Sequence, residues 1–123
     1  MINSRSKGSA GEREACRWLQ EKLELDFLPT RTLDQTREGG ADITCIKPFF
    51  FEVKRCQALA LRDWWVQVTA ACDRSGVRVV MFRQDKQPWR FLISATYIGL
   101  NKGFIQLEQK VAIEWMKKLC KKF

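Results

Sequence analysis

The chain has 123 residues, with 22 lysines and arginines against 14 aspartates and glutamates, a formal net charge of +8 and no histidine. This length and a hydrophobic content of 46% support a single domain with a real core and argue against two domains. The missing histidine excludes serine–histidine and cysteine–histidine nucleophilic catalysis, histidine-ligated zinc and imidazole acid–base chemistry. Any catalysis must therefore use carboxylates, lysine or a hard metal ion.

Cysteine content and hydropathy indicate the cellular setting. The five cysteines, at positions 16, 45, 56, 72 and 120, include no Cys-x-x-Cys pair, and an odd number of this kind is typical of free thiols in a reducing compartment. No apolar run approaches the roughly 18 residues that a membrane helix needs, and the polar start of the chain has no signal-peptide core. We expect a soluble protein of a reducing compartment such as the cytoplasm.

In chain order, residues 1–8 are predicted to form a flexible arm, and residues 9–123 one domain. Ser9 to Leu25 is predicted as a helix, because a capping-box pattern opens it and apolar residues recur at helical spacing. The later helices are expected at 62–74 and 108–122, and the strands at 27–33, 41–46, 49–55, 77–83 and 89–94. This order gives a small α/β or α+β domain with one central sheet.

The strand at 49–55 is the most informative segment. Since side chains two positions apart on a strand share a face, Glu52 and Lys54 project together from one side. A simple ion pair is the plainer interpretation of this pattern. The preceding strand, however, offers a second carboxylate, Asp42, and two carboxylates aimed at one point bind Mg²⁺. A nearby lysine can then position a water for attack on a phosphodiester.

Glu12 has two open interpretations. As the fourth residue of the capping box, it could tie off the start of the first helix. It also shares a helical face with Cys16, Leu19 and Leu23, and a carboxylate on an inward stripe needs a partner that a metal site would supply. Its neighbour Glu14 points elsewhere and is expected in solvent.

Four elements follow one another within about residues 7–67: Lys7 to Glu14, Gly39 to Ile43, Phe51 to Lys54, and Gln67 on the following helix. Together they resemble the motifs of the PD-(D/E)XK nucleases, and in particular those of the small archaeal-type Holliday-junction resolvases and their viral relatives. Ala41 stands where the superfamily commonly has a proline.

The resemblance implies a restriction-endonuclease-like α/β domain with a central mixed sheet flanked by helices. It implies Mg²⁺, with Mn²⁺ as a substitute, and it gives Lys54 the positioning of the attacking water and Gln67 the support of the substrate or the lysine. The implied metal ligands are Asp42, Glu52, the carbonyl of Val53, and Glu12 directly or through water.

The implied activity is that of a Mg²⁺-dependent, structure-selective DNA endonuclease serving DNA recombination and repair. A homodimeric Holliday-junction resolvase is the leading hypothesis, because symmetric cutting of a four-way junction needs two cleavage centres. The alternatives are a nicking or repair endonuclease on another DNA structure, and a non-catalytic DNA-binding protein of the same fold. The last is disfavoured, since binding alone does not need the acidic residues, the lysine and the glutamine together.

Basic residues near the site are predicted to contact DNA phosphates, and a basic chain suits a polyanion because each neutralised phosphate releases counterions. Two further features keep two interpretations each. Trp64 and Trp65 could stack unpaired bases or belong to the core, and the lysines at 117, 118, 121 and 122 could grip phosphate or balance the helix macrodipole. The predicted DNA contacts are Lys7, Arg13, Arg31, Arg37 and Arg55.

The connection between the two site strands decides whether the carboxylates can meet. A two-residue turn at Lys47-Pro48 with regular pairing would direct Asp42 away from Glu52. A slip of one residue reverses every side chain. We therefore predict an odd-length connection or a β-bulge between Ile46 and Glu52, with Asp42 opposite Lys54 and the first helix packed over that face.

Overall fold

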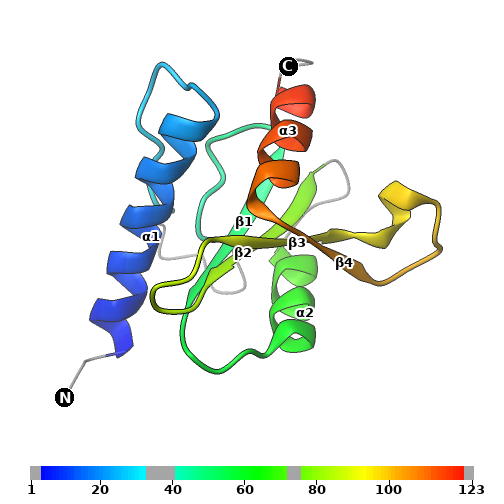
Figure 1. Ribbon diagram of the computed structural model, residues 1–123, viewed down its shortest axis with the longest axis horizontal. Helices are drawn as coiled ribbons and strands as arrows, with labels where there is room; N and C mark the ends of the chain where they lie inside the picture. The colour runs from blue at the N-terminus through cyan, green and yellow to red at the C-terminus, as the bar shows by residue number, and fades with distance from the viewer. Residues whose placement is uncertain (1–3, 33–40, 72–75, 121–123) are drawn as a thin grey trace.

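The computed structural model describes residues 4–32, 41–71 and 76–120 (Figure 1). These residues form three α-helices, one 3₁₀ helix and a sheet of four strands. The expected α/β class, with helices flanking one central sheet, is confirmed. In chain order the elements are α1 (Ser4–Lys22), β1 (Phe49–Arg55), α2 (Leu61–Ala71), β2 (Val77–Arg83), β3 (Arg90–Ser94), η1 (Ala95–Ile98), β4 (Phe104–Leu107) and α3 (Gln109–Cys120).

The sheet is mixed, with the strand order β1-β2-β3-β4. β1 and β2 run parallel, and the register places Arg55 beside Arg83 at their ends. A parallel pair needs a long crossover connection, which α2 supplies. The pairs β2–β3 and β3–β4 are antiparallel, so β2 and β3 form a hairpin. β1 and β4 are the two edges of this sheet.

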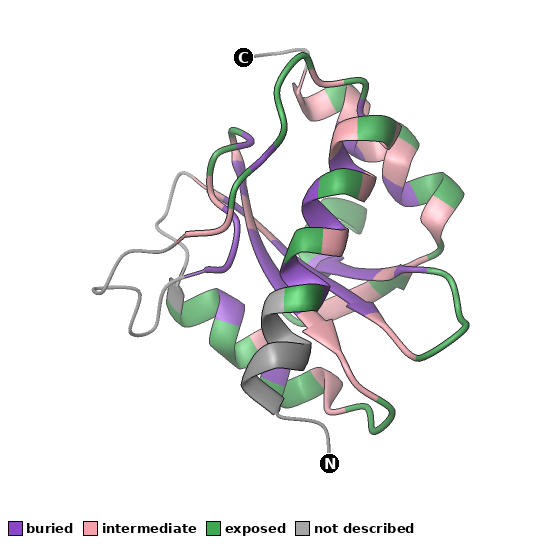
Figure 2. Ribbon diagram, turned by 90° about the vertical axis from the view of Figure 1, so that its left-hand side faces the viewer, coloured by how far each residue is buried: buried purple, intermediate pink, exposed green. Residues whose placement is uncertain are grey.

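Two helices cover one face of the sheet and one helix covers the other. The odd-numbered β1 residues from Phe49 to Val53 join a core shared with α1 and α3. On the opposite face, Val80 and Phe82 of β2 pack against Trp64 and Val68 of α2. In Figure 2 the buried residues follow the strands and the inner side of α1. Even-numbered β1 residues, which include Glu52 and Lys54, therefore project on the α2 side.

The first helix differs from its prediction at both ends. α1 begins at Ser4, so Glu12 lies in its third turn and does not cap its start. Residues 4–8 of the predicted arm are helical, and residues 1–3 lie outside the described residues. A capping pattern marks a helix start only where the preceding chain cannot continue the helix, and residues 4–8 contain no proline. At the other end, Glu24 adopts a left-handed φ of 55° that stops the helix before Leu25.

The strands expected before β1 are mostly absent. Of the strand predicted at 27–33, residues 27–32 form no strand and residue 33 lies outside the described residues, although the Thr32 amide donates to the Asp42 carbonyl at 2.7 Å. The predicted strand at 41–46 is reduced to one antiparallel bridge, between Ile43 and Phe51. Conversely, η1 and β4 are not in the sequence prediction, because four residues are too few to show a period.

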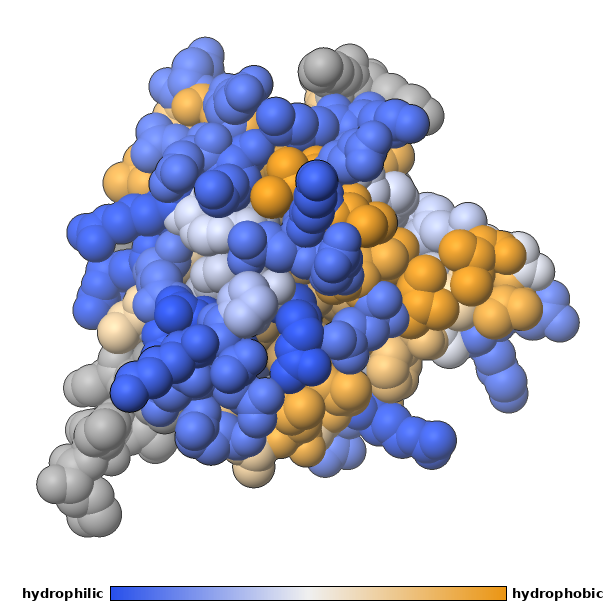
Figure 3. Space-filling model, viewed as in Figure 1, coloured by the Kyte–Doolittle hydropathy of each residue, from blue (hydrophilic) through white to orange (hydrophobic). Residues whose placement is uncertain are grey.

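In the view of Figure 3, apolar side chains gather over η1 and β4, and further apolar patches lie toward α3 and α2. Tyr97, Ile98 and Leu100 are exposed at η1 and just after it, and Tyr97 stacks edge-on against Trp115 of α3 with ring centroids 5.3 Å apart. Val111, one turn before Trp115, is exposed as well. The surface over α1 is hydrophilic in the same view. In the described part of the chain, no helix is long and apolar enough to cross a membrane.

Candidate active site

Glu52 and Lys54 lie side by side near the carboxyl end of β1. The Glu52 side chain is buried, and its Oε2 lies 3.5 Å from Nζ of Lys54, which is partly exposed. The period of two along the strand brings the pair to one face. The ion pair expected as the plainer interpretation is therefore present, and the ammonium group lies at the border between buried carboxylate and solvent.

Asp42 reaches the same end of β1 from the preceding segment. Its Oδ2 accepts a hydrogen bond of 2.8 Å from the backbone amide of Val53. The Asp42 amide donates to the carbonyl of Phe51 at 2.8 Å, so Asp42 is held at both its backbone and its side chain. The outer edge of β1 thus fixes the position of this buried carboxylate.

A β-bulge gives Asp42 this orientation. Lys47 and Pro48 form a two-residue turn, which the Phe49 amide closes on the Ile46 carbonyl at 2.8 Å. Since Ile43 pairs with Phe51, two residues, Thr44 and Cys45, oppose the single residue Phe50.

The predicted one-residue slip therefore exists, and Asp42 shares the face of Glu52. Its predicted location after Ile46 is wrong, because the extra residue precedes Ile46. The register of Asp42 opposite Lys54 is wrong by two residues for the same reason. The bridge between Ile43 and Phe51 places Asp42 next to Glu52 instead.

The two carboxyl groups perturb each other. Burial, the charge of Asp42 and a side-chain hydrogen bond with Asp42 raise the pKa of Glu52 from 4.5 to about 7. The ammonium of Lys54 opposes this shift but does not cancel it. The site therefore holds two carboxyl groups that are shielded from solvent. The single ammonium group of Lys54 does not neutralise both of them.

This arrangement fits a hard divalent cation. Carboxylate oxygens are the ligands that Mg²⁺ prefers, and a cation would relieve the repulsion that raises the pKa of Glu52. The carbonyl of Val53 points to the same outer edge as its amide, because both groups of a strand residue face one neighbour. Since that amide bonds Asp42, the Val53 carbonyl lies on the Asp42 side of β1.

Glu12 approaches from the opposite side of the sheet. It is buried on α1, which packs over the face formed by Phe51 and Val53, and its Oε1 lies 3.8 Å from the Arg31 guanidinium. α1 does not pack over the face of Glu52, contrary to the prediction. Within the described residues, no three acidic or cysteine side chains come close enough together to hold a metal ion, so Glu12 does not complete a cluster with the other two carboxylates.

Gln67 is exposed on α2. Trp65, on one flank of this helix, stacks on Phe104 of the edge strand β4 at 5.8 Å. Gln67 lies on the other flank, since helical residues two apart are rotated by about 200°. β1 forms the opposite edge of the sheet, so this flank faces the strand that carries Glu52.

Sequence reasoning missed a charge network beside the site. Glu14, which was expected in solvent, forms ion pairs with Arg55 at 2.8 Å and with Arg83. Arg55 also pairs with Asp85 at 2.7 Å. The two arginines are neighbours in the parallel register of β1 and β2, and they gather acidic partners between them. The sequence signal that could have predicted this network is the arginine at the end of each of the two predicted strands, 49–55 and 77–83.

The remaining predicted DNA contacts have varied surroundings. Arg13 is exposed on α1, and Arg31 is half-buried beside Glu12, whereas the guanidinium of Arg55 is already engaged by two carboxylates. Arg37 lies outside the described residues, as does the side chain of Lys7.

The tryptophans of α2, the lysines near the end of the chain and the cysteines have the following surroundings. Trp64 is buried against Phe82, and Trp65 contacts both Phe104 and the guanidinium of Arg78, so both belong to the packing of α2. Lys117 pairs with Glu24, while the lysines at 121 and 122 lie outside the described residues. The cysteines of the described segments, at positions 16, 45, 56 and 120, are free thiols.

Comparisons with known proteins agree with this geometry. A family model described as "Phage putative PDDEXK endonuclease" matches residues 3–122. A solved structure, the 1.6 Å structure of Hjc from Archaeoglobus fulgidus, a Holliday junction resolvase from an archaeal hyperthermophile, has a similar fold with a TM-score of 0.55 and 19% sequence identity. The alignment covers 89% of this chain and 99% of that one. No curated protein matches the sequence. The implied restriction-endonuclease-like fold is thereby confirmed.

Proposed function

Because the chain belongs to the phage PDDEXK endonuclease family, we propose that it is a divalent-metal-dependent DNA endonuclease with its active site at the outer edge of β1. The observation that carries the proposal is the buried pair of Asp42 and Glu52, with Lys54 beside it. A protein that only binds DNA gains nothing from two carboxylates placed together, because they repel both each other and the phosphate backbone.

We propose Mg²⁺ as the metal ion, with Mn²⁺ as a substitute. Asp42, Glu52 and the carbonyl of Val53 would hold it, and Glu12 would join through water or after DNA binding. When bound, the ion supplies positive charge to the scissile phosphate and acidifies a water molecule. The hydrogen bond from the Val53 amide keeps the Asp42 carboxylate oriented, and burial beside Val53 limits the movement of Glu52.

Lys54 is proposed to act on the attacking water. Its ammonium is 3.5 Å from Glu52 and partly exposed, so it can donate a hydrogen bond to a water at the border of the site. General acid–base or positioning groups of this kind contribute about 10²–10⁴-fold to rate. Gln67, on the flank of α2 that faces β1, would support Lys54 or the substrate.

DNA is the proposed substrate on the grounds of charge and family. The chain carries a net charge of +8, and the surface over α1 is hydrophilic (Figure 3). Arg13 and Arg31, with Lys7 and Arg37, would contact phosphates next to the cut. We retain Arg55 as a weaker candidate, because Glu14 and Asp85 already neutralise it. Such an enzyme would act in the cytoplasm of a bacterium, an archaeon or an infected host.

A branched DNA, with the four-way junction as the leading case, is the proposed preferred substrate. The fold likeness to a Holliday junction resolvase supports this choice. One chain carries one cleavage centre, so symmetric cutting calls for a homodimer. The exposed apolar side chains Tyr97, Ile98, Leu100 and Val111 offer a surface for a second copy.

One experiment tests the activity. Labelled four-way junction, linear duplex and single-stranded DNA are incubated with the protein in Mg²⁺ and in EDTA. We expect metal-dependent cleavage, fastest on the junction, that is lost in Asp42→Asn and kept in Asp26→Asn, whose exposed aspartate is outside the site. Cleavage of duplex alone would favour a nicking or repair endonuclease, and binding without any cleavage would refute the enzyme.

A second experiment tests the homodimer. Light scattering after size-exclusion chromatography should give twice the mass of one chain for the wild type. Ile98→Glu should shift the protein toward the monomer, since a charge would be buried in the interface. The matched change Lys110→Glu, at an exposed position of α3, should leave the dimer intact. A monomeric wild type that still cuts junctions symmetrically would refute the proposal.

A further inference from the structure

A cavity of about 240 Å³ lies between α1 and the segment that follows it. One wall is α1, with the exposed Arg13 and Arg17 and the buried Cys16. The other wall is the stretch from Leu28 to Arg31. The roles proposed above use Arg13 and Arg31 as general phosphate contacts, but they assign nothing to the cavity itself.

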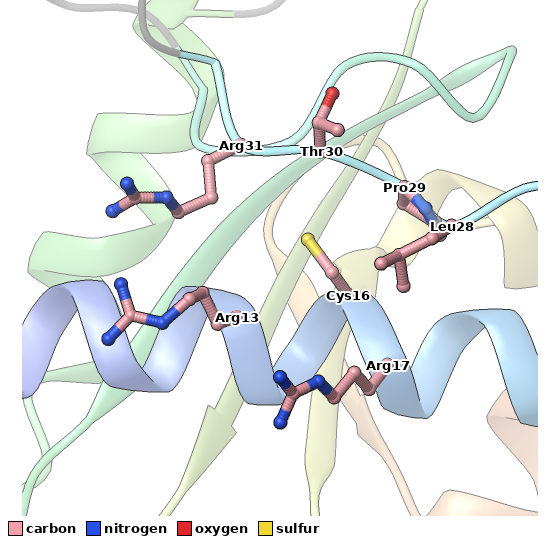
Figure 4. A pocket seen from close by; sticks show the side chains of 7 residues that line it. All are labelled: Arg13, Cys16, Arg17, Leu28, Pro29, Thr30 and Arg31. Atoms are coloured by element: carbon pink, nitrogen blue, oxygen red, sulfur yellow. The ribbon is translucent and has the colours of Figure 1, made fainter.

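The two ends of this cavity differ in chemistry (Figure 4). The guanidinium groups of Arg13 and Arg31 point to one end, and that of Arg17 lies lower, over α1. Leu28 and Pro29 form the other end, and the sulfur of Cys16 lies between. Burial raises the pKa of the Cys16 thiol to about 11, so this group carries no charge at neutral pH. The cavity is therefore amphiphilic, cationic at one end and apolar at the other.

The charge of the cavity suits an anion. Three arginines line it and no acidic residue does. Within the described residues, Arg13 and Arg17 form no ion pair, and Arg31 approaches the Glu12 carboxylate at 3.8 Å. Arginine binds phosphate through its planar fork of donors, which is why it is common at phosphate sites.

The volume exceeds what one phosphate group needs. Water occupies about 30 Å³ per molecule in the liquid, so 240 Å³ corresponds to about eight waters. A phosphate at the arginine end would leave the apolar end empty. A sugar and base attached to that phosphate would fill it and cover Leu28, which is 51% exposed.

The cavity adjoins the candidate active site. Arg31 lines the cavity and also approaches Glu12. The next residue, Thr32, donates its amide to the carbonyl of Asp42 at 2.7 Å. A nucleotide held here would therefore lie close to a phosphate bound at Asp42.

We propose that this cavity holds one unstacked nucleotide of the DNA substrate, with its phosphate at Arg13, Arg17 and Arg31 and its sugar and base against Leu28 and Pro29. The inference rests on the proposed nuclease function and deepens it. The preferred substrate has an unpaired or unstacked nucleotide beside the cleaved bond, as branch points and bulges do and regular duplexes do not. An enzyme selective in this way reads a distortion of the helix, since the energy of unstacking is already spent in such DNA.

The test uses the full-length protein in EDTA, so that it does not depend on cleavage. The probes are two duplexes of the same sequence, one of which has an additional unpaired 2-aminopurine. Affinity is measured by anisotropy and unstacking by 2-aminopurine emission. We expect about tenfold tighter binding of the bulged duplex, because its base buries apolar surface against Leu28 and Pro29. Emission should rise on binding, because the cavity has no aromatic ring to stack on the base.

Leu28→Gln takes away the apolar contact and should remove this preference while it leaves regular-duplex affinity within about twofold. Its matched control is Leu59→Gln, at a leucine of similar exposure, 42%. Arg17→Glu should also remove the preference, and Lys110→Glu should not. The proposal is overturned if Leu28→Gln keeps the preference, or if it weakens both duplexes equally, which would mean a simple phosphate contact.

The outcomes also separate this inference from the proposed function. A preference for the bulged duplex without cleavage of any DNA in Mg²⁺ would refute the nuclease and leave the nucleotide site. Metal-dependent cleavage without a preference that Leu28→Gln removes would refute the nucleotide site and leave the nuclease.

Discussion

The side chain of Asp42 accepts a hydrogen bond from the backbone amide of Val53, at 2.8 Å, across the outer edge of β1. The contact joins two segments that a β-bulge brings together, and it places one carboxylate beside Glu52, the residue that precedes Val53.

Removing either carboxylate charge should abolish cleavage. Asp42→Asn and Glu52→Gln each take away a proposed metal ligand, and we expect at least a hundredfold loss of rate, about 3 kcal/mol in activation free energy. DNA binding should stay the same or tighten, because a charge that repels phosphate is lost. Gel shifts and single-turnover cleavage on a four-way junction measure both. Substantial cleavage by either variant would refute the metal assignment.

Lys54→Ala should separate catalysis from metal binding. The ammonium is assigned to the attacking water, so the rate should fall by about 10²–10⁴-fold while the carboxylates still bind the ion. Calorimetric titration of the variant with Mg²⁺ or Mn²⁺ checks the second part. A variant that no longer binds metal would place Lys54 in the ligand sphere or in the fold instead.

The stability of the metal-free protein should decrease as pH rises from about 4.5 to about 7. Burial and Asp42 raise the pKa of Glu52 to about 7 in the folded state, from about 4.5 when unfolded. Between these values the folded protein binds more protons than the unfolded chain, so raising the pH lowers the free energy of unfolding, by an amount on the order of 1–3 kcal/mol.

Urea unfolding in EDTA at pH 5 and pH 8 measures this effect. Glu52→Gln removes the titrating group, so it should be more stable than the wild type at pH 8, with the difference shrinking at pH 5. Asp26→Asn, at an exposed position, serves as the control. An equal difference at both pH values would mean that Glu52 does not titrate in this range.

DNA binding should weaken steeply with salt, because phosphate contacts release counterions. Arg13→Ala and Arg31→Ala should each lower the slope of log K against log salt by about one. Lys110→Ala, on α3, should leave the slope unchanged. Anisotropy in EDTA across a salt series gives all four values. A flat response of the wild type would point to a protein partner.

Gly11→Ala should destabilise the fold although alanine favours helix by about 1 kcal/mol. A Cβ at Gly11 would come within 2.7 Å of Cγ of Arg55, and Glu14 and Asp85 hold that arginine in place. We expect a net loss on the order of 1 kcal/mol from overpacking. In a double-mutant cycle by urea unfolding, Arg55→Ala should remove most of the penalty. Additive effects of the two changes would contradict this packing.

The strongly patterned parts of the fold could be predicted from sequence. β1, β2, β3, α2 and α3 fall close to their expected ranges, because alternation or helical spacing persists over several residues. The expected offset of one residue, which brings Asp42 to the face of Glu52, is also present. The position of the β-bulge could not be predicted, since a bulge can lie on either side of the turn and the sequence favours neither side.

Long-range contacts explain what the sequence could not show. Glu14 and Arg83 are far apart in the chain and meet only because α1 crosses the ends of β1 and β2. The packing of α1 on the Phe51 face likewise depends on tertiary structure, as Cys16 and Leu19 fit either side of a sheet equally well. The cavity beside α1 depends on the path of residues 28–31, which has no periodic signal.

The outer edge of β1 has a further consequence. An edge strand with free amides invites pairing with another molecule and so promotes aggregation. Here the backbone of Phe51 bonds Ile43, and the Val53 amide is occupied by the carboxylate of Asp42. The residue proposed to bind the catalytic ion therefore also protects the sheet from intermolecular growth. Natural selection on solubility would preserve an oxygen acceptor at this position even in a relative that had lost its chemistry.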